Sequence, residues 1–331
     1  MKLTVPDQNI ALYNIFGDDF DRFAFPSEME IYRVTSGHGG ESFLIVGSEK
    51  TALYDFSMDY CAETTVENVV QTLAMLNGRG DGRHYELDHI LLSHSHYDHI
   101  GALPYILDRF PNAVVCASSK CKSILERENA RKLIRQLGEE ARDLYNPGST
   151  KEIRTDNFRV DRVLKDGDTL SLGDLTITAY ETKGHTDCSL SYYFEPIGLL
   201  LASESTGILE GKDYVHTPAL KSFPDAIRSS YRCEALHPSY ICLPHSGMIP
   251  QERNGAYFEN YRKECKSKMD FVRNLQRRGL SCEEMLEEYI ETYWTPIKES
   301  EQPFEAFRIN SGHILNALLR ALEEEGDTDH V

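Results

Sequence analysis

The chain has 331 residues, of which 40% are hydrophobic, and it carries a formal net charge of −18 at pH 7. This length suggests one large domain with an appendage, and the hydrophobic content is enough for a core. The acidic balance argues against a protein that binds nucleic acid, which wants a basic face, and against binding to anionic membranes. The sequence has no apolar stretch of about 18 residues, so we expect no membrane-spanning helix.

The eight cysteines form no Cys-x-x-Cys pair, and several lie in apolar runs where a thiol acts as a small hydrophobic group. The first residues, Met1–Pro6, do not resemble a signal peptide. We therefore expect free thiols in a reducing compartment and a cytoplasmic protein.

Taken in chain order, the first half mixes helical and strand patterns. Residues 62–77 predict an amphipathic helix that ends at Gly78. The short apolar run Ile90–Leu92 predicts a buried strand. Residues 118–146 predict a long, charged helical insertion, which the Asn-Pro-Gly sequence at 146–148 closes.

The second half predicts strands first and helices afterwards. Residues 256–325 contain three predicted helices, with breaks at Arg278-Gly279 and Thr295-Pro296. We expect one domain over residues 1–250, with the helical insertion at about 118–148. A C-terminal helical extension over 251–331 would follow it, as a lid over a site or as a dimer interface.

The most informative pattern is the stretch 94–99, His-Ser-His-Tyr-Asp-His, which follows the strand predicted at Ile90–Leu92. If the chain stays extended, His94, His96 and Asp98 point the same way, because strand side chains repeat every second residue. His99 would then open a helix over Ile100–Leu107. Imidazole nitrogens and carboxylate oxygens suit zinc, iron or manganese, so the pattern predicts a metal site.

Three further ligand-type side chains each follow a strand-like run. His185 lies on a turn between the runs Leu175–Thr182 and Leu190–Phe194. Glu204 ends an apolar run that begins at Leu199, and His245 ends another that begins at Ile241. Each of them lies where a rigid strand meets a loop, which is where binding residues concentrate.

With these motifs in this order, the chain resembles the metallo-β-lactamase superfamily over about residues 30 to 250. Residues 40–47 and 51–57 resemble its opening strands, which end at the family's first acid, Asp55. Residues 166–172 resemble the hairpin before the second histidine motif. The resemblance implies an α/β (α+β) fold, a four-layer αββα sandwich of two mixed β-sheets with outer helices.

The resemblance also implies two metal ions, of zinc, iron or manganese. One would be held by His94, His96 and His185, and the other by Asp98, His99 and His245. Glu204 would bridge the two ions together with a hydroxide. The family usually has Asp at this position, and Glu is one methylene longer, so a bridging Glu204 needs its backbone set back.

Other side chains have less specific roles. Lys183 and Asp187 replace prolines that often flank the second histidine motif in the family. Asp55 either orients a ligand or caps a turn. Cys188 lies three residues past His185 and is a weaker candidate ligand. Tyr192, Tyr193 and His313 are candidate substrate contacts, although the two tyrosines alternate along a strand and only one can face the site.

These residues point to a dinuclear metal-dependent hydrolase with Asp98 and Glu204 as catalytic residues. A metal-bridged hydroxide would attack a small ester, thioester, lactone or phosphodiester. The alternative is a metal-containing effector or ligand-binding protein whose hydrolysis is incidental. A flavin-linked di-iron oxidoreductase is disfavoured because that branch has a carboxylate at the position of His96. The expected partner is a small-molecule substrate. If the C-terminal extension is a dimer interface, a second copy of the chain is also a partner.

Overall fold

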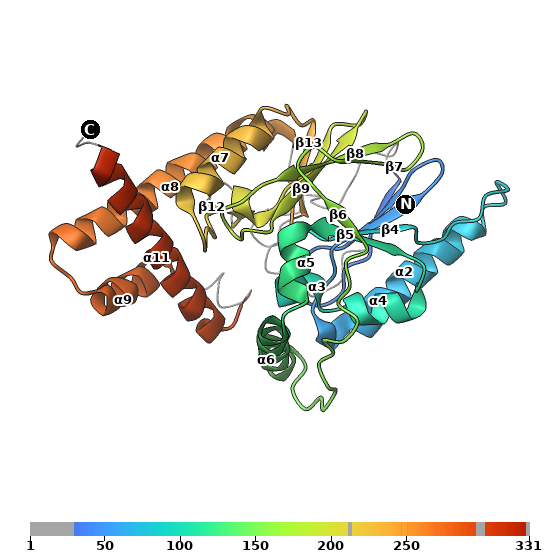
Figure 1. Ribbon diagram of the computed structural model, residues 1–331, viewed down its shortest axis with the longest axis horizontal. Coiled ribbons are helices and arrows are strands. Elements are labelled where there is room, and N and C mark those ends of the chain that lie inside the picture. The colour runs from blue at the N-terminus through green and yellow to red at the C-terminus, as the bar shows by residue number, and fades with distance from the viewer. Residues whose placement is uncertain (1–29, 211–213, 246, 250, 296–301, 329–331) are drawn as a thin grey trace.

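The computed structural model describes residues 30–210, 214–245, 247–249, 251–295 and 302–328. The predictions made for Met1–Pro6 and Pro296 fall outside these ranges. Two β-sheets lie face to face, and helices cover both outer faces (Figure 1). The predicted four-layer αββα arrangement is confirmed.

The first sheet holds six strands in chain order: β1 (Ile31–Arg33), β2 (Phe43–Val46), β3 (Thr51–Tyr54), β4 (His89–Leu91), β5 (Val114–Ser118) and β6 (Arg162–Leu164). The pairs β1–β2 and β2–β3 are antiparallel, whereas β3 to β6 run parallel. In β2, Phe43 and Ile45 point into the core between the sheets, and Leu44 and Val46 into the core under the helices. Both faces are therefore apolar, as a strand buried on both sides requires.

The second sheet has the order β14-β13-β10-β9-β8-β7. Its strands are β7 (Thr169–Ser171), β8 (Thr176–Glu181), β9 (Leu190–Glu195), β10 (Leu199–Leu201), β13 (Tyr240–Leu243) and β14 (Gly247–Met248). Only β10 and β13 pair in parallel. A small hairpin, β11 (Ile208–Leu209) and β12 (Val215–His216), lies outside the sheet.

The first sheet is covered by η2 (Asp59–Cys61), α2 (Ala62–Asn77), α3 (Tyr97–Ile100), α4 (Leu103–Arg109), α5 (Ser119–Leu125) and α6 (Glu128–Tyr145). The helix predicted at 62–77 is confirmed by α2. The predicted helical insertion is two helices, because Arg127 is extended, with φ −83° and ψ 127°. This break lets α5 bury Cys121 and Leu125 on the sheet while α6 crosses η2 and α3.

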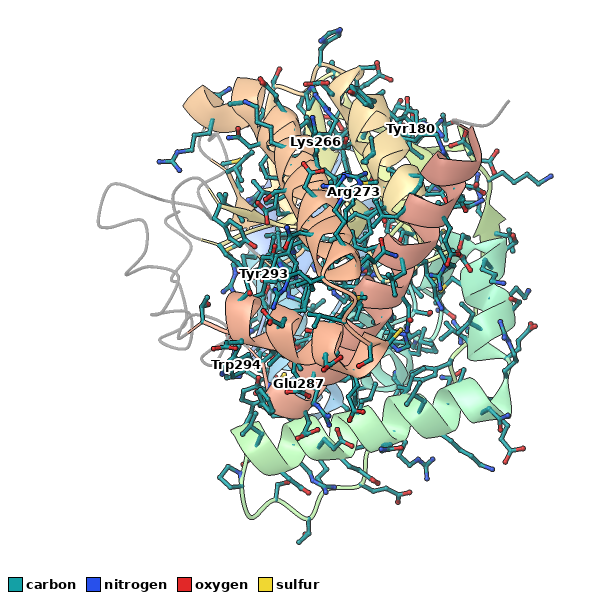
Figure 2. The ribbon with its side chains drawn as sticks, turned by 90° about the vertical axis from the view of Figure 1, so that its left-hand side faces the viewer. Tyr180, Lys266, Arg273, Glu287, Tyr293 and Trp294 are labelled. Atoms are coloured by element: carbon teal, nitrogen blue, oxygen red, sulfur yellow. The ribbon has the colours of Figure 1, made fainter. Side chains whose placement is uncertain are left out.

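On the side of the second sheet lie η3 (Glu204–Thr206), α7 (Phe223–Glu234), η4 (Gln251–Arg253), α8 (Asn254–Arg277), α9 (Cys282–Tyr293) and α11 (Phe304–Thr328). The last three confirm the helices predicted in 256–325. The helices α7 and α8 pack together, α11 packs on both of them, and α9 packs on α11. Figure 2 shows this layer from outside, with Lys266 and Arg273 along α8 and Trp294 just past α9. Leu200 and Ile241 of the sheet share one hydrophobic cluster with Tyr261 of α8 and Leu318 of α11. Among the described helices, none is long and apolar enough to cross a bilayer.

Candidate metal centre

The ligand-type side chains gather where strands of both sheets end. His94 and His96 follow β4, and Asp98 and His99 lie within α3. His185 lies between β8 and β9. Glu204 opens η3 after β10, and His245 follows β13. Because β10 and β13 run parallel, their carboxyl ends carry Glu204 and His245 to the same edge.

The predicted path of residues 94–99 is wrong in one detail. The chain is extended only to His96, whose φ and ψ are −75° and 147°, and α3 begins at Tyr97 rather than after His99. Asp98 therefore reaches the centre from the first turn of a helix, not by strand alternation. An acidic residue in that turn also complements the positive end of the helix dipole.

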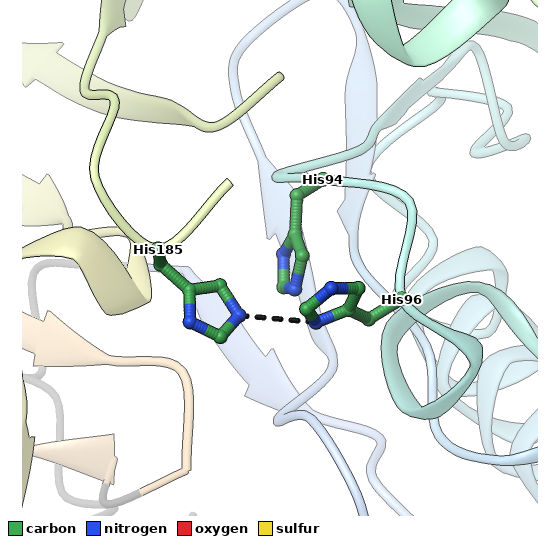
Figure 3. A group of neighbouring side chains, drawn as sticks. All are labelled: His94, His96 and His185. Atoms are coloured by element: carbon green, nitrogen blue, oxygen red, sulfur yellow. Dashed lines mark hydrogen bonds between the residues drawn. The ribbon is translucent and has the colours of Figure 1, made fainter. Parts of the chain in front are cut away.

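Three imidazoles form the first trio, which is His94, His96 and His185. Figure 3 shows His94 and His96 on one segment and His185 approaching them from a separate loop. The Nδ1 of His96 lies 3.0 Å from the Nε2 of His185. One ring nitrogen from each of the three lies within 4.8 Å of the others, an arrangement that can hold a metal ion.

The second trio is Asp98, His99 and His245. The Nε2 atoms of His99 and His245 are 3.2 Å apart. The Oδ2 of Asp98 lies 3.6 Å from the first of these atoms and 3.7 Å from the second. This group also meets the 4.8 Å criterion for a metal ion.

Glu204 lies between the two trios. Its Oε2 is 3.4 Å from the Nε2 of His185, in the first trio. Its Oε1 is 2.8 Å from the Nε2 of His99 and 3.2 Å from that of His245, in the second. The longer side chain thus reaches both groups from η3, one residue past the buried Ser203.

Each outward-facing Nδ1 has a hydrogen-bond acceptor. His185 donates to the carbonyl of Pro218 at 2.6 Å, and His245 to the carbonyl of Gly39 at 3.2 Å. His99 donates to Oδ2 of Asp55 at 2.9 Å. Such acceptors fix the tautomer, so that the Nε2 lone pair points into the centre.

Asp55 connects the two trios from behind. Besides His99, its carboxylate accepts hydrogen bonds from the backbone N–H and the hydroxyl of Ser93. The Ser93 oxygen in turn accepts from the Nδ1 of His94 at 2.9 Å. Asp55 is fully buried and has a positive φ of 42°. Of the two predicted alternatives, the contacts support the orienting role.

Two rings of the first trio, His94 and His96, favour the neutral form. Burial, followed by repulsion from His99 and His96, lowers the pKa of His94 well below its usual value. Burial and the proximity of His185 lower the pKa of His96 to about 3. Neutral rings offer the lone pairs that a metal ion needs.

The second trio favours protonated imidazoles. Burial opposes the charge on His99, but Asp98, Asp55 and Glu204 outweigh it and raise its pKa well above the usual value. Burial also opposes the charge on His245, and Glu204 outweighs it, so that pKa is raised too. The carboxylates therefore create a need for positive charge here.

One buried atom indicates that the centre is built for a cation. In the described part of the chain, the Nε2 of His94 is buried and has no hydrogen-bond partner, although Glu204 lies 3.5 Å away. A buried polar atom without a partner costs free energy. Imidazole nitrogens and carboxylate oxygens are suitable ligands for zinc, iron or manganese, so these residues fit a metal ion.

The other sequence candidates lie elsewhere. Tyr192 is fully buried and donates to the carbonyl of Leu92 at 2.8 Å, so its hydroxyl is not a substrate contact. Tyr193 packs on the opposite side of the sheet, against the α7–α8 layer. His313 is exposed on α11.

Cys188 is not a ligand in any of the His/Asp groups. It lies within reach of the hydroxyls of Thr186 and Ser95, at 3.3 and 3.5 Å. The interaction with Cys121 lowers its pKa to about 6. All eight cysteines, which lie within the described ranges, are free thiols, as predicted.

Three orienting groups were missed by the sequence prediction. Two are the backbone carbonyls of Gly39 and Pro218, which no residue type reveals. The third is Ser93, whose position between a buried strand and His94 was the available signal.

The model of the metallo-beta-lactamase superfamily matches residues 36–245, well over half of the chain. The chain belongs to this superfamily. Its members share the αββα fold seen here, and the matched span begins and ends within the loops that carry Gly39 and His245.

Two curated relatives and one solved structure illustrate the likeness. A metallo-beta-lactamase fold-containing protein of Sulfurisphaera tokodaii is 25% identical over 66% of this chain and 80% of its own length. The hydroxyacylglutathione hydrolase of Buchnera aphidicola is 29% identical over 34% of this chain and 32% of its own. A metallo-beta-lactamase family protein from Thermus thermophilus has a TM-score of 0.58 and 18% identity. That alignment covers 92% of this chain and 95% of the other, so the shared fold extends beyond residues 36–245.

Proposed function

We propose that the protein is a dinuclear metal-dependent hydrolase that acts on a small ester, thioester, lactone or phosphodiester. The observation that carries this proposal is the position of Glu204, whose carboxylate lies within 3.5 Å of ring nitrogens in both trios. A carboxylate placed in this way can bridge two cations. When bound, two metal ions supply an activated water as nucleophile and polarise the group under attack.

Positioning of the centre, proton transfer and bridging fall to different side chains. Hydrogen-bond acceptors fix the outer nitrogens of His94, His99, His185 and His245 and so hold these four rings in one geometry. Asp98 is 18% exposed, whereas Glu204 is 6% exposed. We assign to the Asp98 carboxylate the transfer of a proton at the solvent-facing side, and to Glu204 the bridging role.

No Ser or Cys nucleophile is part of this proposal. The part of the chain that the structure describes has no thiol among its three His/Asp groups. The similarity to a hydroxyacylglutathione hydrolase supports acyl hydrolysis, but it spans only 34% of this chain. The leaving group therefore stays open among the classes named above.

The test combines elemental analysis with a substrate panel. Purified protein loaded separately with zinc, iron and manganese should hold two ions per chain. It should hydrolyse at least one of a panel of simple esters, thioesters, lactones and phosphodiesters. A chelator should abolish turnover, and the same metal should restore it. A single ion under metal-replete conditions would contradict the dinuclear centre, and two ions without turnover would favour the metal-containing effector.

A further inference from the structure

Four rings that the proposed chemistry does not use lie beside the metal centre. We call them the aromatic patch: His38, Tyr60, Tyr97 and Tyr145. They come from the loop before β2, from η2, from α3 and from the end of the insertion helix α6. All four are partly exposed, as are the candidate ligands His96 and Asp98.

Three of the rings, His38, Tyr60 and Tyr145, support one another in a fixed arrangement. His38 stacks on Tyr145 with ring centroids 3.9 Å apart and planes 15° from parallel. Tyr60 stacks on the same Tyr145 ring at 5.9 Å and 27°. The Tyr60 oxygen accepts from the backbone N–H of His38, and its hydroxyl lies 2.9 Å from the His38 Nδ1. Aromatic rings held in this way offer flat contact area at low entropic cost.

The patch is attached to the metal centre by its own backbone. His38 precedes Gly39, whose carbonyl accepts from the Nδ1 of His245 at 3.2 Å. The next residue, Gly40, donates its N–H to the carbonyl of Asp98 at 2.8 Å. A side chain at Gly39 would meet that same carbonyl at 2.7 Å, so the loop can approach α3 only with glycine there. Tyr97 itself stands between His96 and Asp98 in the chain.

The rings of the patch are uncharged. Burial lowers the pKa of His38, which favours the neutral ring, and burial also raises the pKa of Tyr60. A flat, uncharged group can therefore stack on these rings without needing an ion pair.

We propose that the aromatic patch is the specificity site of the metal centre and binds a flat, uncharged ring next to the bond that is hydrolysed. The inference rests on the proposed hydrolytic function, and it narrows the substrate to esters or related compounds that carry an aryl group. The insertion helix α6 contributes the central ring, Tyr145, so this selectivity comes from a segment added to the sandwich.

The first measurement does not depend on turnover. Binding of naphthol, which is flat, is compared with binding of decahydronaphthol, which is puckered, to metal-loaded and metal-free protein. Tyr145→Ala should raise the Kd of naphthol about three- to tenfold, while the Kd of decahydronaphthol changes less than about twofold. Tyr145→Phe keeps the ring and should bind as the wild type does. Tyr231→Ala is the matched control, because Tyr231 is 57% exposed on α7.

The second measurement uses benzyl acetate and cyclohexylmethyl acetate, which share the acyl group and differ in the flatness of the ring. Tyr145→Ala should raise KM for benzyl acetate with kcat unchanged and leave KM for the other ester unaltered. If Tyr145→Ala does not fold, as judged by circular dichroism and metal content, His38→Ala serves in its place with the same expectation.

The outcomes separate this inference from the hydrolase proposal. Selective loss of naphthol binding supports the patch even if no ester is turned over. Equal losses for both probes, or no loss in either variant, overturn the patch even if the protein hydrolyses small aliphatic esters.

Discussion

The two trios of the metal centre share one carboxylate but differ in their surroundings. His94 and His185 are 1% and 4% exposed, whereas Asp98 and His245 are 18% and 24% exposed. In the first trio, burial lowers the pKa values of His94 and His96 and favours their neutral rings, although His96 is partly exposed. The second contains a carboxylate and favours protons on its imidazoles. We therefore expect the first trio to hold a metal ion more tightly than the second.

Removing the shared carboxylate should have the largest effect, because it affects both trios at once. Glu204→Ala leaves His99 and His245 without their nearest anion. We expect fewer than two metal ions per chain and a loss of turnover of roughly a thousandfold or more, above the ~10–100-fold typical of an orienting residue. Elemental analysis and kinetics measure both effects.

The exposed Glu126→Ala is the control for that variant, since its side chain lies away from the centre at the end of α5. Glu204→Asp tests the reach of the longer side chain, and it should retain partial activity only if η3 can move inward. A Glu204→Ala protein with two metals and full turnover would show that the carboxylate bridges nothing.

Acidification should separate the two trios. A metal ion must displace the protons of His99 and His245, whose pKa values are raised. Below those pKa values, affinity should fall about tenfold per pH unit for each proton displaced. The pKa of His96 is about 3 and that of His94 is well below its usual value, so protons compete at these two rings only at much lower pH. Metal content after dialysis between about pH 8 and about pH 5 should therefore fall from two ions to one before it reaches none. Loss of both ions in a single step would refute the difference between the trios.

Asp55→Asn should weaken both trios by a smaller amount. The amide cannot accept from His99 and Ser93 as the carboxylate does, yet Asn tolerates the positive φ of 42° at this position. We expect a loss of about 10–100-fold in metal affinity or activity with the fold intact. Titration with a competing chelator measures the affinity.

Ser93→Ala is the companion variant, because Ser93 connects Asp55 only to His94. Its effect should be confined to the first trio. Equal weakening of both trios by Ser93→Ala would mean that Asp55 does not act through separate contacts.

The smallest effect is expected at Cys188. Its thiol contacts Thr186 and Ser95 near the first trio, but not a ligand. Cys188→Ala should cost about 1 kcal/mol of stability and leave two metal ions per chain. Thermal unfolding and metal analysis test this pair of expectations, and a lost ion would place the thiol in the centre after all.

Much of this architecture could be predicted from the sequence because its signals are local. Each ligand-type side chain follows a short apolar run, and those runs form β4, β10 and β13. The double-sided apolar pattern of residues 43–46 requires cover on both faces. The helical period at 62–77 predicts α2, which helps to cover one of these faces, and the second sheet covers the other.

The missed features depend on contacts between distant segments. The carbonyls of Gly39 and Pro218 orient ligands more than thirty residues away, at His245 and His185. The break at Arg127 follows from how α5 and α6 pack, not from a Pro or Gly in the sequence. Asp98 enters through a helix because α3 begins at Tyr97, and the length of a strand end is set by its neighbours.

The order of the ligands along the chain has a consequence for biosynthesis. The contact between His96 and His185 closes a loop of 89 residues, and the contact between His99 and His245 closes one of 146. The added length costs little entropy, less than about 0.6 kcal/mol, so it hardly affects the final stability. The order does affect when each trio can assemble during synthesis, because His185 emerges from the ribosome well before His245. All three side chains of the first trio are therefore available to a metal ion before His245 completes the second trio.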